Sequence, residues 1–368
     1  MRNNKCIVTV LDTISETSMP LNEFVLYRYN RYKEDKQYII VCSEYKKETI
    51  TLPENLEVFY VENDKKKLKK CMKEILKINT NIIVHLHQIK SAMFFYFTMF
   101  VEKKNYKVLF TVHSLYSQRN IKYKISSTIC SLMSDTITCV SNSSLKEYSK
   151  FVRFIKKDKI FAIQNGVDLD RINQTIMNVN QPIKNVNKEQ KKIKTLVYVG
   201  RVIPIKNQIF LVNLIEKIKD CKLIFIGEEG NNKEISKLIS SLSLDDRIKI
   251  TGLVPREKVF QILQSSDIYV SSSTVEGLPI SVLEALAIGL PAIISDIAPH
   301  IEISKKIEGI KVVSLNDEEA WITQINEYLN KSDEDLKKIG RKSKMCVFKY
   351  FSLDRMHKEY NQLYEKLI

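Results

Sequence analysis

The sequence predicts an α/β protein built around two parallel β-sheets. Apolar runs of strand length alternate with helix-length segments along almost the whole chain, which is typical of parallel sheets. One polar stretch, residues 173–192, interrupts this alternation and is poor in apolar side chains. With 368 residues, of which 44% are hydrophobic, the chain is long enough to bury two cores. We therefore expect two Rossmann-like domains connected by a linker.

The strands are expected in two series of six. The first series comprises residues 6–11, 38–42, 82–86, 108–112, 136–140 and 160–163. The second series comprises residues 195–199, 223–226, 248–250, 268–270, 292–294 and 312–313. These segments predict an N-terminal domain at residues 1–172, a linker at residues 173–192 and a C-terminal domain at residues 193–350.

The composition is typical of a protein from a reducing compartment. Seven cysteines, with no pair at the C-x-x-C spacing, indicate free thiols. The longest apolar run, residues 92–101, is about half as long as a membrane span. Asp12 and Glu16 interrupt the opening strand, so we expect no secretion signal. The expected location is the cytoplasm.

The positive charge is concentrated in the N-terminal half. Residues 1–180 contain 29 Lys and Arg against 18 Asp and Glu, which gives +11 of the formal net charge of +15. Lysines surround Leu68, and the helical spacing of Leu68, Met72 and Ile75 predicts an amphipathic helix with a basic face. Such a face is either simply solvated or contacts an anionic membrane, here the inner face of the cell membrane. Nucleic acid is the least favoured partner, because the sequence carries no recognition motif for it.

Two carboxylates, Glu276 and Glu284, lie eight residues apart around the start of a predicted helix. Pro279 suits a first helical turn, and Gly289 ends the apolar run that follows. The N–H groups at the amino end of such a helix attract anions, and Gly277 lets a phosphate or a sugar approach the backbone. Carboxylates beside this site suit polyol hydroxyls. The simpler alternative is a capped helix with one exposed and one ion-paired glutamate.

A second feature lies upstream, where the predicted strand at residues 195–199 ends in Gly200. Arg201 and Lys206 follow this turn before the next helix. A strand end that presents two cations is suited to clamp a diphosphate.

Together these segments resemble the retaining glycosyltransferases of family 4, which have the GT-B fold. The resemblance rests on the Glu-x7-Glu motif, the Gly-Arg-x4-Lys-Asn turn and four shorter segments at residues 165–168 (Asn-Gly-Val-Asp), 289–291 (Gly-Leu-Pro), 295–296 (Ser-Asp) and 351–353 (Phe-Ser-Leu). As an ordered set these motifs are specific. The resemblance implies two Rossmann-like domains that face each other across a cleft. It also implies that the C-terminal segment, residues 351–368, crosses back to the N-terminal domain.

The resemblance further implies a nucleotide-sugar site in the C-terminal domain. Arg201, Lys206 and the amino end of the Pro279 helix would stabilise the leaving phosphate, without a metal or another cofactor. Glu276 would hold hydroxyls of the donor sugar, and Glu284 would hold those of the ribose. The implied donor-binding residues are Gly200, Glu276, Gly277, Leu278, Pro279, Ile280, Glu284, Gly227 and Val254. The implied catalytic residues are Arg201, Lys206, Glu276 and His113.

Three histidines and an acidic pair need separate interpretation. The family places a histidine beside the donor sugar at the strand end where His113 stands, and the alternative is a buried, hydrogen-bonded histidine. His85 and His87 share a strand face, but no Cys or carboxylate stands at a matching offset, so a structural or substrate-facing role is favoured over zinc. Asp168 and Asp170 match a metal-binding Asp-x-Asp pattern. The pattern begins in the Asn-Gly-Val-Asp segment, however, which disfavours a metal there.

The chain also departs from the family. All nine glycines lie at or after Gly166, so the loop at residues 11–20 lacks the glycine pair with which many relatives contact the donor phosphates. The turn that begins at Gly227 has Gly-x-x-Gly where relatives have Gly-x-Gly. We therefore expect the phosphates to be bound in the C-terminal half and the acceptor in the N-terminal half.

The expected function is hexosyl transfer, with retention at the anomeric carbon, from a UDP- or GDP-sugar to a glycan or a lipid-linked acceptor in bacterial surface polysaccharide synthesis. Two alternatives stay open: a catalytically silent binding subunit and a nucleotide-sugar epimerase of the same fold. The sequence identifies neither the sugar, nor the base, nor the acceptor.

Overall fold

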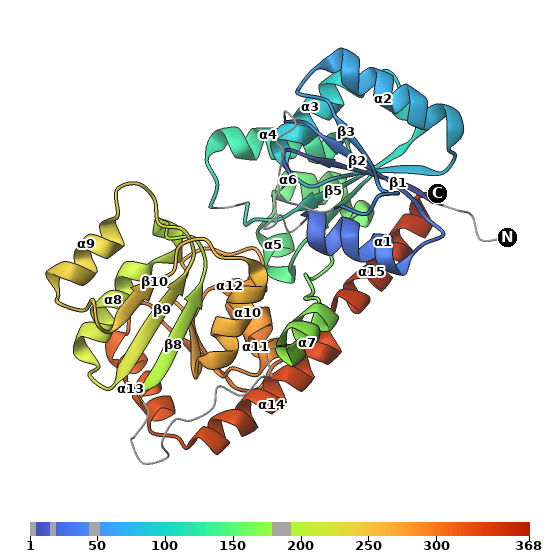
Figure 1. Cartoon of the computed structure of the whole chain (residues 1–368). Coiled ribbons are helices and arrows are strands. Elements are labelled where there is room, and N and C mark those ends of the chain that lie inside the picture. The colour runs from blue at the N-terminus through green and yellow to red at the C-terminus, as the bar shows by residue number, and fades with distance from the viewer. Residues whose placement is uncertain (1–4, 15–19, 44–51, 117, 179–192) are drawn as a thin grey trace. The chain divides into compact units, whose positions relative to one another are not determined.

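The computed structural model describes residues 5–14, 20–43, 52–116, 118–178 and 193–368. The chain forms two compact units (Figure 1). The first unit contains the chain up to Asn165 and the C-terminal segment Leu353–Ile368, and the second contains Gly166–Ser352. Among the described residues, no helix combines the length and the apolar character needed to cross a membrane.

The first unit contains a seven-stranded parallel sheet in the order β3-β2-β1-β4-β5-β6-β7. Its strands are β1 (Cys6–Leu11), β2 (Lys36–Val41), β3 (Glu57–Tyr60), β4 (Ile82–Leu86), β5 (Lys107–Val112), β6 (Thr136–Cys139) and β7 (Ile160–Ala162). The central strands β1 and β4 are buried along their whole length, because helices cover both faces of the sheet. All six strands predicted for this half are confirmed. β3 was not predicted, since this edge strand begins with Glu57 and is exposed or half-buried throughout.

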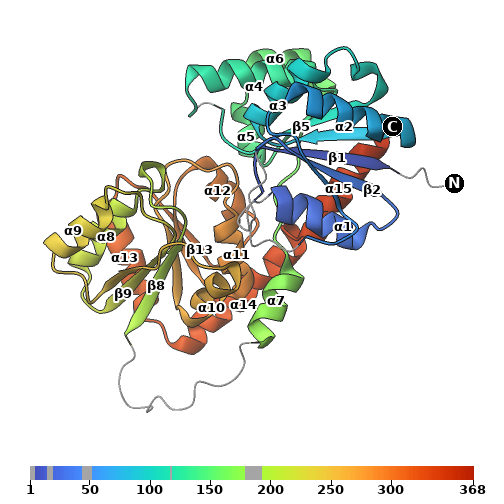
Figure 2. The same ribbon diagram turned by 45° about the horizontal axis from the view of Figure 1, so that its top comes forward.

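Alternate side chains of these strands point to opposite faces of the sheet. Val84 and Phe110 pack with the helices α2, α3 and α4, whereas Ile83 and Leu109 pack with α15. Figure 2 shows α2, α3 and α4 on one side of this sheet and α1 and α15 on the other. The helices of the unit are η1 (Pro20–Leu26), α1 (Tyr27–Arg31), α2 (Lys65–Ile78), α3 (Ile89–Met99), η2 (Lys103–Asn105), α4 (Ile121–Met133), α5 (Asn142–Glu147), α6 (Lys150–Ile155), η3 (Lys157–Lys159) and α15 (Leu353–Leu367).

The last helix of the chain, α15, belongs to the first unit, as the family resemblance implied. Met356 and Tyr360 are buried against the sheet. Asp354 accepts a hydrogen bond from the hydroxyl of Tyr27 at 2.8 Å, and a ring nitrogen of His357 lies 2.6 Å from the carbonyl oxygen of Glu23. The apolar face of α15 therefore completes the core that the first 165 residues leave open on this side.

The second unit contains a six-stranded parallel sheet in the order β10-β9-β8-β11-β12-β13. Its strands are β8 (Lys194–Val199), β9 (Cys221–Ile226), β10 (Ile248–Ile250), β11 (Ile268–Ser271), β12 (Ala292–Ser295) and β13 (Ile310–Val313), so all six predicted strands are confirmed. Its helices are α7 (Leu169–Asn178), η4 (Pro204–Lys206), α8 (Gln208–Lys217), α9 (Glu234–Ser241), α10 (Arg256–Ser265), α11 (Ile280–Ile288), α12 (Ala298–Ser304), α13 (Glu318–Leu329) and α14 (Asp333–Tyr350).

The boundary between the units differs from the predicted one. The division follows Asn165, so residues 166–172 belong to the second unit, and the first unit takes up the chain again at Leu353. Residues 173–178, which were expected in the linker, complete α7, which packs on α10 and α11. The segment is polar because α7 is a surface helix that buries one side, with Ile172 in the core. The rest of the predicted linker, residues 179–192, lies outside the described residues.

Two glycines allow the backbones of α11 and α14 to touch. Gly289 ends α11 with a φ of +105°, in the left-handed region that glycine adopts without strain. A Cβ atom at Gly340 of α14 would lie 1.7 Å from the carbonyl oxygen of Gly289. No side chain fits at this contact, so position 340 requires glycine.

Replacing Gly340 with Ala should lower the free energy of unfolding of the second unit by about 2 kcal/mol, because α14 must move away from α11. This cost exceeds the gain of about 1 kcal/mol from the higher helix propensity of alanine. The chain has one tryptophan, Trp321, which is buried in the second unit, so urea unfolding followed by its fluorescence reports this unit. Gly230→Ala is the control, since its added Cβ meets nothing within 4 Å. Equal midpoints for both variants would contradict the close contact.

Candidate active site

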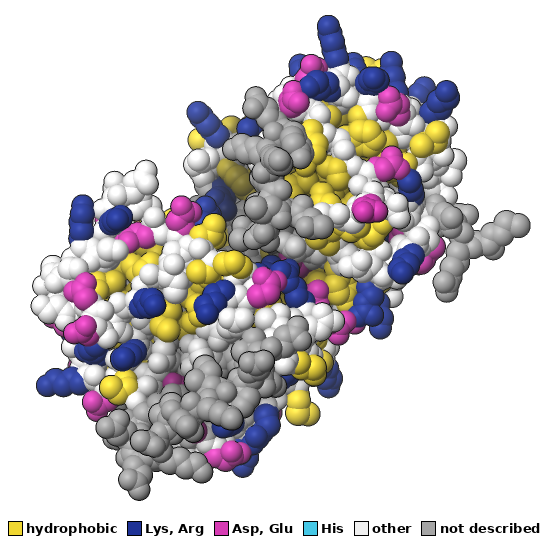
Figure 3. Space-filling model, in the orientation of Figure 1, with side chains coloured by type: hydrophobic (Ala, Val, Ile, Leu, Met, Phe, Trp, Pro, Cys, Tyr) yellow, Lys and Arg dark blue, Asp and Glu magenta, His cyan; other side chains and the backbone are white. Residues whose placement is uncertain are grey.

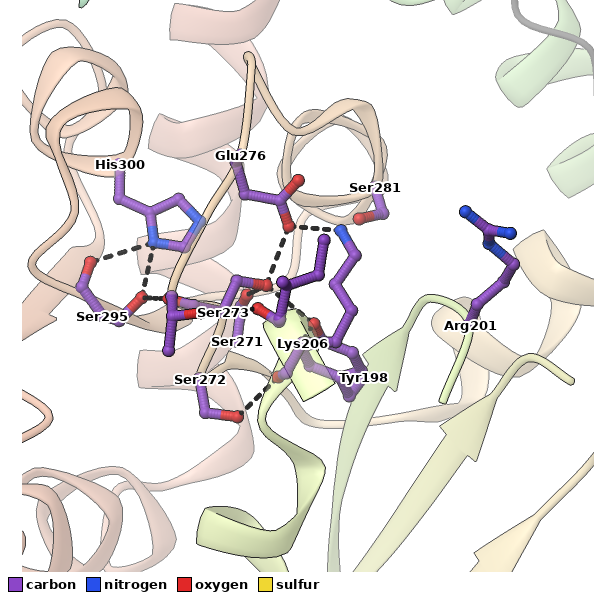
Figure 4. Close-up of polar contacts among 12 residues, drawn as sticks. Tyr198, Arg201, Lys206, Ser271, Ser272, Ser273, Glu276, Ser281, Ser295 and His300 are labelled. Carbon is purple, nitrogen blue, oxygen red and sulfur yellow. Dashed lines mark hydrogen bonds and ion pairs between the residues drawn. The ribbon is translucent and has the colours of Figure 1, made fainter. Parts of the chain in front are cut away.

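The centre of the candidate site is an ion pair between two loops at the carboxyl ends of the strands. Lys206 ends η4 after β8, and Glu276 lies in the loop between β11 and α11. The ammonium group of Lys206 pairs with Oε1 of Glu276 (Figure 4). Both side chains are largely buried, with 19% and 12% exposed. The structure thus brings together one residue from each of the two motifs that the sequence singled out.

A buried layer of hydroxyl groups supports this pair. The hydroxyl of Ser273 donates to Oε1 of Glu276 at 2.8 Å and lies 2.8 Å from the hydroxyl of Tyr198. Ser272 holds the other loop, because its hydroxyl donates to the carbonyl oxygen of Asn207 at 2.7 Å. The side chains of Tyr198, Ser272 and Ser273 are almost completely buried. Hydrogen bonds of this kind fix the carboxylate of Glu276 in place before any ligand binds.

His300 of α12 lies behind the Glu276 loop and was not predicted. Its Nδ1 is 2.9 Å from the carbonyl oxygen of Ser295, so this nitrogen carries the proton. Ser295 in turn donates its hydroxyl to the carbonyl oxygen of Ser273 at 2.5 Å. Burial lowers the pKa of His300 to about 4, so the ring is neutral at pH 7. The Ser-Asp segment at residues 295–296 predicted a functional region nearby, but no motif predicted a histidine at position 300.

The second carboxylate of the motif is also paired. Glu284, on α11, is 6% exposed, and its Oε1 pairs with the guanidinium group of Arg256 on α10. The sequence predicted Glu284 as the holder of ribose hydroxyls and did not identify Arg256. Helices α10 and α11 are separated by a strand in sequence, so only the fold places these side chains together. The simple alternative of one exposed and one paired glutamate is wrong, since both carboxylates are buried or nearly buried and ion-paired.

Arg201, the other predicted cation, does not join the central pair. Its side chain is exposed, and Figure 4 shows its guanidinium group apart from Lys206 and Glu276. The carbonyl oxygen of Arg201 accepts a hydrogen bond from the side chain of Gln208 at 3.0 Å. The backbone of Arg201 therefore helps to hold the loop, while its guanidinium group is exposed to solvent.

The predicted glycine turns meet at the ends of β8, β9 and β10. Gly227 has a φ of +152°, and a Cβ atom there would lie 2.1 Å from the carbonyl oxygen of Gly200. Gly227 also forms an antiparallel bridge with Gly252. The segment carrying Val254 follows directly, and that side chain is half-buried. The glycines thus keep a narrow stretch of backbone beside Lys206 free of side chains.

Helix α11 begins beside Glu276, as expected. Pro279 is its N-cap residue and supplies no side-chain hydrogen bond to the first turn. Leu278 and Pro279 are buried, whereas Gly277 and Ile280 are half-buried. The positive end of the helix dipole therefore adds to the charge of Lys206 at this point.

The predicted histidine of the first unit, His113, lies in a cluster of aromatic rings. Its Nε2 is 3.0 Å from Nδ1 of His87, and the ring of Phe24 contacts both imidazoles. Burial lowers the pKa of His113 to about 4 and that of His87 well below its usual value, so both rings are neutral at pH 7. His85 is a core residue, with hydrogen bonds of 2.7 Å to Tyr364 and to Thr111.

Asp168 of the Asp-x-Asp pair has a structural role. Oδ1 of Asp168 accepts a hydrogen bond from the backbone N–H of Arg171 at 3.0 Å, so Asp168 caps the amino end of α7. In the described part of the chain, no three His, Cys, Asp or Glu side chains come together as potential metal ligands.

Comparison with known proteins identifies both halves of the chain. The family model of the glycosyl transferases group 1 matches residues 179–345, and that of Glycosyltransferase Family 4 matches residues 27–171. The chain belongs to the family 4 glycosyltransferases. Its two α/β units with parallel sheets are the architecture of the GT-B fold.

Two of the relatives that the chain resembles are bacterial proteins. The capsular polysaccharide biosynthesis glycosyltransferase CapH of Staphylococcus aureus is 27% identical over 194 residues, which cover 51% of this chain and 50% of the relative. The UDP-Gal:alpha-D-GlcNAc-diphosphoundecaprenol alpha-1,3-galactosyltransferase of Escherichia coli is 27% identical over 197 residues, with coverage of 51% and 50%. The chain spans about half the length of the curated relatives it matches.

A solved structure shares the whole fold. Anabaena Alr3699/HepE, crystallised in complex with UDP and glucose, superposes with a TM-score of 0.76 over 98% of this chain and 100% of that chain. The two sequences are 14% identical, so this likeness concerns the fold alone.

Replacing Arg256 with Met should destabilise the second unit by about 3 kcal/mol, because it leaves the carboxylate of Glu284 buried without a partner. The double variant Arg256→Met/Glu284→Gln should recover most of this loss, since no buried charge is left. Urea unfolding followed by Trp321 fluorescence measures both values. A double variant as unstable as the single one would show that Arg256 stabilises the fold by packing alone.

Proposed function

We propose that this protein is a retaining glycosyltransferase that moves a hexosyl group from a nucleotide sugar to a glycan or a lipid-linked acceptor. The observation that carries this proposal is the Lys206–Glu276 pair beside the amino end of α11. This arrangement combines a cation and a helix dipole, which suit a phosphate, with a fixed carboxylate, which suits sugar hydroxyls.

In the proposed reaction, these groups stabilise the charge that develops on the leaving group. The bond between the anomeric carbon and the phosphate oxygen breaks, and its electron pair stays on the phosphate. Lys206, the α11 dipole and Arg201, once its exposed side chain turns inward, stabilise this negative charge. The acceptor oxygen bonds to the anomeric carbon on the face that the phosphate leaves, and its proton passes to the phosphate. The anomeric configuration is thereby retained without a nucleophile from the protein.

The carboxylates and His113 hold hydroxyl groups in this proposal. On donor binding, Glu276 exchanges its bond to Lys206 for hydroxyls of the sugar, while Lys206 turns to the diphosphate. Glu284 offers its remaining carboxylate oxygen to the ribose, oriented by Arg256. His113 of the first unit is neutral at pH 7, so we propose it as a hydrogen-bonding group for a hydroxyl and not as an acid.

The nucleotide and the acceptor are proposed from chemistry and from relatives. The side-chain-free backbone around Gly227 and Gly252, together with Val254, suits the edge of a nucleobase. UDP is the first donor nucleotide to test, because HepE was crystallised with UDP and glucose. The names of the two bacterial relatives support a lipid-linked acceptor and a role in surface polysaccharide synthesis.

We place this activity in the cytoplasm, at the inner face of the membrane. All seven cysteines have free thiols, and six of them are buried. Burial raises the pKa of Cys6 and of Cys139 to about 12, so these thiols are protonated. Free cysteines in this number fit a reducing compartment.

Lys206→Ala should reduce turnover of the correct nucleotide sugar about a hundredfold, which corresponds to about 3 kcal/mol of transition-state stabilisation. Release of UDP or GDP from a panel of nucleotide sugars, with and without acceptor, measures this rate. Lys249→Ala removes an exposed lysine from β10 and serves as the control. Wild-type turnover in the Lys206 variant would refute the phosphate-binding role. Product analysis by NMR tests retention, and an inverted anomer would exclude the proposed mechanism.

Turnover should be unchanged in excess EDTA, because Lys206 and the α11 dipole supply the positive charge that a metal ion would otherwise provide. The comparison is the same assay with added manganese. A strict requirement for manganese would show that a cation takes part, and the carboxylates of Asp168 and Asp170 would then be the first residues to substitute.

A further inference from the structure

The first unit exposes a group of apolar side chains at the amino edge of its sheet, which is the side where the strands begin. The strands β5, β6 and β7 begin at this edge, and the helices α3, α4 and α6 end there. The side chain of Phe154 is 84% exposed, and that of Val101 is 79% exposed. We define the amino-edge patch as the exposed apolar residues at these helix ends, which are Phe97, Phe100, Val101, Leu132, Phe151, Phe154 and Ile155.

Polar contacts hold these helix ends side by side. Oδ2 of Asp135, just before β6, accepts hydrogen bonds from the backbone N–H of Val108 at 2.7 Å and from Lys103 at 2.8 Å. Lys156, just after α6, donates to the carbonyl oxygen of Ser134 at 2.7 Å. The ends of α3 and α6 therefore both lie against the end of α4. The exposed apolar residues therefore lie on three neighbouring helices.

Basic residues lie close to the patch in the sequence. Residues 97–107 and 150–161 together contain eight Lys and Arg and two acidic residues. Lys157 and Lys159 are exposed. Burial, and then the nearby charge of Lys159, lower the pKa of Lys156.

The basic helix predicted from the sequence has a different surface. Leu68, Met72 and Ile75 of α2 are buried in the core, so its outward side is mainly charged. Figure 3 shows Lys and Arg side chains gathered over α2. One large apolar side chain, Ile78 at the end of the helix, is exposed. α2 thus offers charge, whereas the amino-edge patch offers charge and apolar side chains together.

We infer that the amino-edge patch docks this protein on an anionic lipid bilayer. Single side chains that protrude from three helix ends suit the fluid interface of a bilayer, which needs no preformed pocket. The nearby lysines keep their charged ends at the depth of the headgroups and are attracted by anionic lipids. The inference deepens the proposed membrane contact and rests on it, but it does not require sugar transfer. It assigns the contact to this patch and not to α2.

Vesicle cosedimentation of the full chain, without any nucleotide sugar, tests this inference. The protein should bind vesicles that contain phosphatidylglycerol and should not bind vesicles of phosphatidylcholine alone. Binding should weaken as the salt concentration rises, because salt screens the attraction to the headgroups. The double variant Val101→Ser/Phe154→Ser should lower the partition coefficient roughly tenfold or more, since two exposed apolar groups are lost. Unchanged binding of this variant would overturn the inference.

Two variants with the same change in charge separate the patch from α2. Lys157→Glu/Lys159→Glu alters the patch, and Lys69→Glu/Lys70→Glu alters the exposed side of α2. The patch variant should lose roughly tenfold in binding, and the α2 variant less than about threefold. Equal losses would show that binding follows net charge alone and would overturn the assignment.

Further measurements test whether the patch binds a second copy of the chain and whether the variants are folded. If sedimentation equilibrium without vesicles shows a dimer that Val101→Ser/Phe154→Ser dissociates, the patch binds a second copy and the inference is wrong. Thermal unfolding must be unchanged in the variants for the binding data to count. Donor hydrolysis is assayed separately, so a failure of the proposed reaction is distinguished from a failure of docking.

Discussion

The arrangement of the candidate site depends on the ion pair between Lys206 and Glu276. This pair connects the loop after β8 to the loop before α11, two segments that are far apart in the sequence and adjacent in the parallel sheet. A pair that is mostly removed from water is strong only when hydrogen bonds satisfy its remaining polar atoms. Here the buried hydroxyl of Ser273 donates a further hydrogen bond to the carboxylate oxygen of Glu276 that Lys206 contacts, and the hydroxyl of Tyr198 supports Ser273 in turn. The layer beneath the pair therefore fixes both loops before a ligand arrives.

The other carboxylate of the site is also paired with an opposite charge. Each carboxylate of the Glu-x7-Glu motif has its own cation, and the nearby imidazole of His300 is neutral. The buried charges of the site therefore balance one another. In the proposed reaction a diphosphate and hydroxyl groups would replace these partners, and neither glutamate would transfer a proton. Arg201 stays exposed, which leaves one cation available to a ligand from the solvent side.

Glycine determines how closely the backbone segments of the second unit approach one another. Gly227 lies against the carbonyl oxygen of Gly200, and Gly340 lies against that of Gly289. The first contact clears space beside Lys206, and the second fixes the end of α11, the helix that carries Glu284. The first unit contains no glycine, and its loops close through side-chain hydrogen bonds. Asp12, for example, accepts a bond from the backbone N–H of Ser91 at 2.7 Å.

The sequence by itself determined the two series of strands, the start of α11 at Pro279 and the two motifs of the site, whereas the return of α15 was implied by the family resemblance. These features depend on local patterns, because a buried parallel strand needs an unbroken apolar run and a helix end needs a particular residue. Only the tertiary structure decided which charges meet. Arg256 reaches Glu284 from another helix, and His300 lies behind the Glu276 loop, although no spacing in the sequence connects them. Side chains on different helices become neighbours because of the order of the strands in the sheet, and strand order is not a local property of the chain.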